Sequence, residues 1–73
     1  MRDPLDAFAA NLKRVRKQRG LSQEALAHIC GLNTTHVAKI ERSEREPGVR
    51  TVVKLINGLQ SSAAELFSDT EDR

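Results

Sequence analysis

The amino-acid sequence predicts an all-α fold in which five short helices form a single domain over residues 1–73. Apolar residues recur at spacings of three and four, which is the period of a helix packed on a core. Capping residues precede these stretches, and glycine or proline separates several of them. A chain of 73 residues buries only a modest core, so one domain is expected. The expected core residues are Phe8, Leu12, Leu26, Cys30, Leu32, Val37, Ile40, Val52, Leu55, Leu59 and Leu66.

The first helix is expected to start at Asp3-Pro4, because aspartate caps helices well and proline is tolerated at the first helical position. Gly20 ends this helix. The apolar face carries Leu5, Phe8, Ala9, Leu12 and Val15. The opposite face carries the cations Lys13, Arg14, Lys17 and Arg19. These cations complement the negative end of the helix dipole, and Arg19 is equally suited to bind a phosphate group.

Residues 22–42 contain two further helical patterns separated by a short turn. Ser22 is expected to cap the first, Gly31 to end it in a left-handed conformation, and Asn33 to cap the second. Their apolar positions are Leu26, Ile29, Cys30, Val37 and Ile40. Two helices joined by so short a turn cross at a steep angle. This is the geometry of a helix-turn-helix, whose second helix can enter the major groove of DNA.

The fourth helix follows a polar loop that ends at Pro47-Gly48, where Gly48 is expected as the cap. Its apolar residues are Val49, Val52, Val53, Leu55, Ile56 and Leu59. Valine favours strands, but this spacing is helical. Ser62 and Glu65 form the pattern of a capping box for a last short helix. The polar residues 68–73 are expected to be frayed.

These motifs together resemble the phage-repressor type of helix-turn-helix, the Cro/CI or XRE family, from about Leu12 to Phe67. The matching residues are Leu21-Ser22-Gln23-Glu24, Leu26-Ala27, Gly31-Leu32, Val37, Ile40-Glu41-Arg42, Leu55, Leu59 and Glu65-Leu66-Phe67. The resemblance implies a lambda-repressor-like domain that binds DNA by sequence. The chain also resembles the small controller proteins of restriction–modification systems. That subgroup usually has arginine where Thr34 stands and an aromatic residue where His36 stands.

Arg16 lies close to the apolar stripe of the first helix, unlike the other cations. The family resemblance implies that it pairs with Glu41. We favour this partly buried ion pair over contact between Arg16 and DNA. Removal of one partner would leave an unpaired charge, so the pair is expected to be important for stability.

The outer face of the third helix is predicted from a rotation of about 100° per residue. If Val37 and Ile40 point inward, Thr35 and Lys39 point outward. The predicted DNA-binding residues are Gln23, Asn33, Thr34, Thr35, His36, Lys39, Arg42, Ser43 and Arg45. The resemblance assigns base reading to Thr34, Thr35 and Lys39, and phosphate binding to Gln23; the alternative for Gln23 is an exposed helix-start residue. Glu44 and Glu46 would repel phosphate and are expected to point elsewhere.

The net charge of +2 is unevenly distributed. Residues 1–50 contain ten Lys/Arg and six Asp/Glu, giving +4, whereas residues 51–73 contain two and four, giving −2. A basic front half favours double-stranded DNA as the partner. No enzyme, catalytic residue, metal site, cofactor or small-molecule ligand is expected, because the two histidines and one cysteine lack the spacing of a metal site. The sequence has no membrane segment, and its single cysteine suits a reducing cytoplasm.

An apolar surplus on the fourth and fifth helices predicts a homodimer interface at Val53, Ile56 and Phe67. Two-fold symmetry would then match a pseudo-palindromic operator. The alternative is an antitoxin-like or adaptor module, which uses the same fold to hold a partner protein. Binding to DNA from around the protein's own gene distinguishes the two functions. The operator sequence, the regulated genes and the choice between repression and activation stay open at this point.

Overall fold

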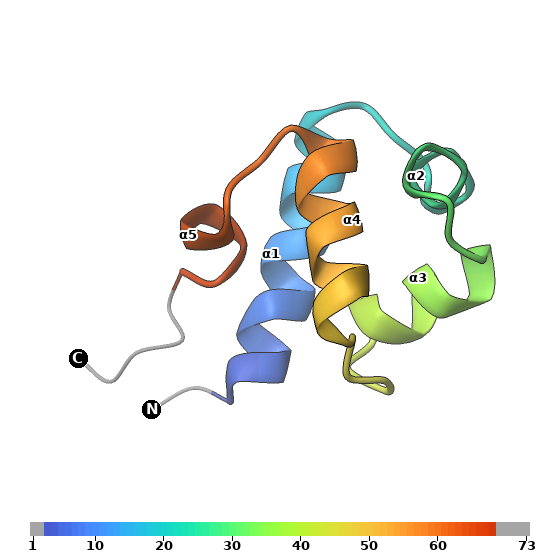
Figure 1. Cartoon of the computed structure of the whole chain (residues 1–73). Coiled ribbons are helices and arrows are strands. Elements are labelled where there is room, and N and C mark those ends of the chain that lie inside the picture. Colours follow the sequence, from blue (N-terminus) through green and yellow to red (C-terminus); the bar gives the residue numbers. More distant parts are fainter. Residues whose placement is uncertain (1–2, 69–73) are drawn as a thin grey trace.

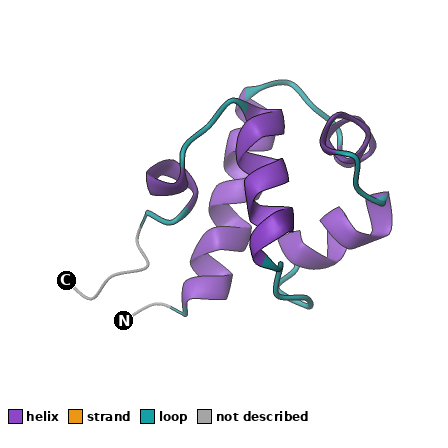
Figure 2. Cartoon of the chain, viewed as in Figure 1, coloured by secondary structure: helices purple, strands orange, loops and turns teal. Residues whose placement is uncertain are grey.

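Residues 3–68, which this computed structural model describes, form five helices and no strand (Figures 1 and 2). The helices are α1 (Pro4–Gln18), α2 (Gln23–Cys30), α3 (Thr34–Glu41), α4 (Val49–Leu59) and α5 (Ala63–Leu66). The predicted all-α class is therefore confirmed. Of the segment expected to be frayed, residues 69–73 lie outside the described part of the chain.

The predicted caps are present at the helix starts. Asp3 accepts from the Leu5 amide at 2.8 Å, and Ser22 accepts from the Ala25 amide at 3.0 Å. Gly48 precedes α4 without a side-chain cap. The bonds accepted by Asp3 and Ser22 pair backbone amides that a helix start otherwise leaves unpaired.

The predicted capping box of α5 is only half formed. Ser62 Oγ accepts from the Glu65 amide at 3.0 Å, as expected. The Glu65 carboxylate, however, accepts from the Ser61 hydroxyl and lies 3.8 Å from Arg19 Nη2. The carboxylate therefore contacts side chains and does not return to the backbone amide of the cap.

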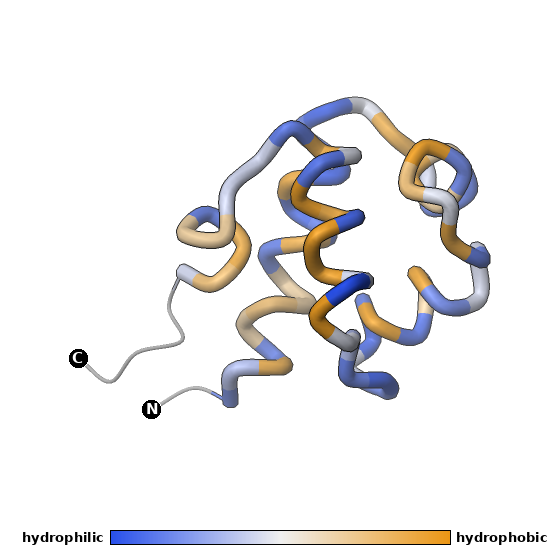
Figure 3. The backbone as a smooth tube through the Cα atoms, viewed as in Figure 1, coloured by the Kyte–Doolittle hydropathy of each residue, from blue (hydrophilic) through white to orange (hydrophobic). Residues whose placement is uncertain are grey.

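The core lies where α3 and α5 pack on α1 and α2 packs on α3 and α4. Figure 1 shows α5 on the opposite side of the molecule from α2 and α3. Apolar residues recur along α4 between polar ones (Figure 3), so this helix can face the core and still present a polar side. Two expected core residues, Leu32 and Val52, are only partly buried, whereas Val15 and Ala27 are buried in the central cluster.

Gly58 allows α4 to approach α2 closely. A Cβ atom at this position would overlap Cys30 Sγ and lie 3.3 Å from Ile29 Cγ2. Cys30 is only 7% exposed, which agrees with its expected place in the core. Burial raises the pKa of the Cys30 thiol, so its reactive thiolate form is disfavoured. No helix within residues 3–68 is long and apolar enough to cross a membrane.

Candidate nucleic-acid interface

The turn between α2 and α3 begins at Gly31, which has φ 68° and ψ 35°. The Leu32 amide donates to the Ala27 carbonyl at 2.8 Å, and the Gly31 amide donates to the His28 carbonyl at 3.3 Å. This pair of bonds closes the end of α2, and a left-handed residue is needed to make it. Asn33 Oδ1 then accepts from the backbone amide of the second residue of α3 at 2.7 Å. Local chemistry therefore ends one helix and starts the next within three residues.

The outer face of α3 is polar and accessible. Thr34, Thr35 and Lys39 are exposed, whereas Val37 and Ile40 are fully buried. The orientation of α3 therefore agrees with the predicted rotation, and the three candidate base-reading side chains are all accessible. Threonine offers a hydroxyl and a methyl group, and lysine donates to guanine in the major groove.

His36 and Ser43 are less accessible than the sequence suggested. His36 is half-buried, and its Nε2 atom is buried without a hydrogen-bond partner among residues 3–68. Ser43 is half-buried and has a left-handed backbone with φ 60°. Only part of each side chain is therefore available to a ligand on the outer face.

Arg16 and Glu41 join α1 to the end of α3. Arg16 Nε lies 2.6 Å from Glu41 Oε2, and Arg16 Nη2 donates to Glu41 Oε1 at 3.0 Å. Arg16 Nη1 also donates to the Leu21 carbonyl at 2.7 Å, before α2 begins. The two side chains are only 9% and 2% exposed. The Arg16 guanidinium thus connects three parts of the chain: α1, the segment before α2 and the end of α3.

Gln23 belongs to the same network. Its Nε2 atom donates to Glu41 Oε1 at 3.0 Å, and the residue is half-buried. The interpretation of Gln23 as a simple exposed helix-start residue is therefore wrong. The amide carries two hydrogens, and only one of them is used by Glu41. The other can still be donated to a ligand at the start of α2.

Arg42 and Glu44 form an exposed pair beyond α3. Arg42 Nε donates to Glu44 Oε2 at 2.9 Å, and Nη2 donates to Oε1 at 3.2 Å. The hydrogen bond from Arg42 is the main cause that lowers the pKa of Glu44; desolvation opposes it, and the positive charges of Arg42 and Lys39 lower the pKa further. The expectation that Glu44 points away from this site is wrong. An incoming phosphate must compete with this carboxylate for the Arg42 guanidinium.

Arg19 has a partner within the protein. Its Nε atom donates to the Leu59 carbonyl at 3.0 Å, and Nη2 donates to the Gln60 carbonyl at 3.5 Å. These carbonyls lie at the end of α4, where helix carbonyls lack intrahelical donors. Between the two interpretations left open for Arg19, this arrangement favours the structural one.

Residues 12–66 match the helix-turn-helix family HTH_3. The chain belongs to this XRE-type family. The control protein C.SmaI of Serratia marcescens is 35% identical over 66 residues, which are 90% of this chain and 79% of that protein. The resemblance to controller proteins of restriction–modification systems is therefore confirmed.

Solved structures of controller proteins share the fold. The crystal structure of C.AhdI from Aeromonas hydrophila matches with a TM-score of 0.83 at 36% identity, over 86% of this chain and 96% of that one. The C.Esp1396I tetramer in complex with its natural 35 base-pair operator matches with a TM-score of 0.82 at 27% identity, over 92% and 88% of the two chains.

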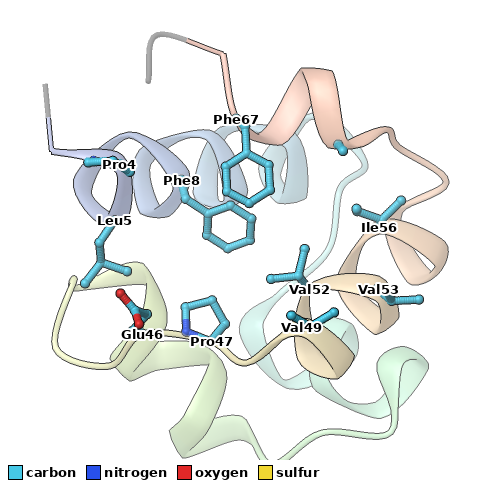
Figure 4. A pocket seen from close by; sticks show the side chains of 11 residues that line it. Pro4, Leu5, Phe8, Glu46, Pro47, Val49, Val52, Val53, Ile56 and Phe67 are labelled. Carbon is cyan, nitrogen blue, oxygen red and sulfur yellow. The ribbon is translucent and has the colours of Figure 1, made fainter. Parts of the chain in front are cut away.

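An apolar groove of about 470 Å³ lies away from the outer face of α3, between α1, α4, α5 and the segment before α4. In Figure 4 the rings of Phe8 and Phe67 lie together on one side, facing Val52 of α4. The two ring centroids are 4.9 Å apart. The residues predicted for a homodimer interface all line this groove: Val53, Ile56 and Phe67. Sequence reasoning missed Val49, which also lines the groove and is 81% exposed.

Proposed function

We propose that this chain is a transcriptional regulator that binds a pseudo-palindromic operator as a homodimer, with α3 in the major groove. The observation that carries the proposal is the exposed polar face of α3, which is held on the buried pair between Arg16 and Glu41. Family membership supports it, because the related C.Esp1396I is a tetramer in complex with its natural operator. This buried pair attaches α3 rigidly to the rest of the domain, and base readout depends on accurate placement of short side chains.

The proposed contacts divide into base readout and phosphate positioning. Thr35 can contact a thymine methyl or donate its hydroxyl, and Lys39 can donate to guanine O6 and N7. Thr34 stands at the start of α3, where a helix meets the groove first. The amide hydrogen of Gln23 that Glu41 does not use can be donated to a phosphate at the start of α2. Arg42 would exchange its Glu44 partner for phosphate, which makes binding sensitive to salt.

We assign the apolar groove to a second copy of this chain. Val49, Val53 and Phe67 are 81%, 48% and 37% exposed, an apolar surface that water disfavours. The groove is made by α1, α4 and α5, so its occupation leaves the outer face of α3 free. A two-fold dimer places two reading helices one turn of B-DNA apart, about 34 Å. An adaptor that holds a different protein in this groove is the competing function.

A DNA titration tests the proposal. Labelled DNA from around the protein's own gene is titrated at several salt concentrations, with scrambled DNA of equal length as the control. We expect tight binding to one natural segment, a two-fold related sequence within it, and affinity that falls steeply as salt rises. Equal affinity for natural and scrambled DNA would contradict sequence-specific regulation. Selection of bound sites from a random pool then defines the operator.

A further inference from the structure

Asn11 is a buried polar residue in the middle of α1, with only 5% of its surface exposed. Its Nδ2 atom donates to the Leu66 carbonyl at 3.0 Å and to the Ser68 carbonyl at 2.9 Å. Its Oδ1 atom accepts from Arg14 Nη2 at 3.2 Å. Both amide hydrogens are therefore used on a segment more than fifty residues away in the chain. The amide hydrogens thus bind the distant segment, whereas the carbonyl oxygen of the same side chain has a local partner in α1.

The segment that Asn11 holds is the end of α5. This helix has four residues, far fewer than a helix needs to be stable by itself. The carbonyls at a helix end have no donors inside the helix, so an external donor stabilises that end. The other strong attachment is Leu66, whose side chain is fully buried. Asn11 and Leu66 thus hold the end of α5 on α1 through two hydrogen bonds and one buried side chain, beside the more exposed pair of Glu65 with Arg19.

Phe67 stands between the two carbonyls that Asn11 binds. Its backbone is fixed on both sides, so its ring is directed against Phe8, with 4.9 Å between the centroids. The ring is 37% exposed and lines the apolar groove. Without the two bonds, the end of α5 would lose its polar attachment, and Phe67 would sample other positions at the wall of the groove.

We propose that Asn11 is a positioning residue for self-assembly: it holds the end of α5 so that Phe67 shapes the groove for a second copy of the chain. This inference rests on the homodimer of the proposed function. Among the described residues, Asn11 makes its side-chain hydrogen bonds to the end of α5 and to Arg14 of α1, and none to α3. The strength of assembly is therefore set in part by a buried amide that is absent from the assembly surface itself.

The test compares Asn11→Ala with Gln18→Ala, which removes an exposed amide from the same helix. Sedimentation equilibrium of the full chain measures the dissociation constant of the dimer. We expect Asn11→Ala to raise it about tenfold or more, because two hydrogen bonds to the end of α5 are lost, one buried and one partly buried, and Gln18→Ala to leave it unchanged. If the wild type dimerises and Asn11→Ala leaves the dissociation constant unchanged, the inference is overturned.

Amide hydrogen exchange separates positioning from general stability. We expect Asn11→Ala to accelerate exchange at residues 63–68 and to leave the amides of α2 and α3 protected. Faster exchange throughout α1 to α4 would overturn the inference, since Asn11 would then support the whole fold. If Asn11→Ala loses its helical circular dichroism, Asn11→Ser, which keeps a hydroxyl donor, is measured in its place with the same expectations.

A double-mutant cycle tests whether Asn11 acts through Phe67. The dimer constants of Asn11→Ala, Phe67→Ala and the double variant are compared. We expect the combined effect to be clearly smaller than the product of the two single effects, because both changes remove the same ring from its place. Independent effects would overturn the inference. A monomeric wild type would instead contradict the homodimer of the proposed function, so the two failures are distinguishable.

Discussion

The α2–α3 and α4–α5 connections share one backbone design. Each has three residues between the helices, and each begins with a left-handed residue: Gly31 with φ 68° and Gln60 with φ 53°. Each ends the preceding helix with a matching backbone bond, donated by Leu32 at 2.8 Å and by Ser61 at 2.9 Å. In both, the residue after that is a side-chain N-cap. The same local chemistry thus produces both changes of direction.

The two connections differ in what holds the helix that follows. The eight-residue α3 ends at Glu41, whose carboxylate is buried in the network with Arg16. The four-residue α5 lacks a charged anchor of this kind and depends on Asn11 and the buried side chain of Leu66. Turn chemistry therefore determines where a helix begins. Under the proposed function, the outer face and the anchor of each helix suit α3 to contact with DNA and the end of α5 to assembly.

The largest effect should come from the anchor of α3. Glu41→Gln leaves Arg16 as a buried cation without its full partner, so we expect unfolding free energy to fall by about 2–4 kcal/mol. Glu44→Gln is the matched control, because its pair with Arg42 is exposed and should contribute little. Thermal denaturation of both variants measures the difference. Similar melting temperatures would show that the buried pair does not distinguish α3 from α5.

The next effect concerns Phe67, the residue directly after α5. Phe67→Glu places a charge in the apolar groove, and we expect the dimer to weaken by about 2 kcal/mol or more while the monomer stays helical. Operator affinity should fall with it, because half-sites then bind independently. Sedimentation and circular dichroism measure assembly and folding. A wild type that stays monomeric and still binds one half-site tightly would contradict the role given to α5.

A smaller effect is expected on the outer face of α3. Thr35→Ala and Lys39→Ala should each weaken operator binding by about 1–2 kcal/mol and relax the base preference at one position. Lys54→Ala removes an exposed lysine from α4 and serves as the control for lost charge. Titrations use matched and scrambled operators. Equal losses on both DNAs would make Thr35 and Lys39 phosphate contacts instead of base readers.

The helices and their caps were predictable because their signals are local. Ser22, Gly31 and Asn33 act on backbone groups a few residues away, so the sequence alone indicates where the helices end and start. The face of α3 followed from the same period. A family resemblance was needed for the partner of Arg16, which lies 25 residues away.

The missed contacts depend on geometry that the sequence does not display. Asn11 lies three residues after Phe8 and four before Val15, a spacing that marks the buried face, but nothing in it names Leu66 as the acceptor. Glu44 meets Arg42 only two residues away, because Ser43 adopts a left-handed conformation that is uncommon for serine. Long-range partners and unexpected turns were therefore beyond local reasoning.

The smallest effects test the shared turn itself, through opposite changes at its two left-handed positions. A Cβ at Gly31 meets no heavy atom within 4 Å, so Gly31→Ala should cost about 1 kcal/mol from backbone strain alone. Gln60→Gly removes that strain but adds freedom to the unfolded chain, so a gain of about 0.5 kcal/mol is expected. The bond from Arg19 to the Gln60 carbonyl is retained, since it uses the backbone. Denaturant unfolding measures the change in unfolding free energy of each variant, which should be a loss for Gly31→Ala and a gain for Gln60→Gly. Destabilisation by Gln60→Gly would show that the two turns are not equivalent.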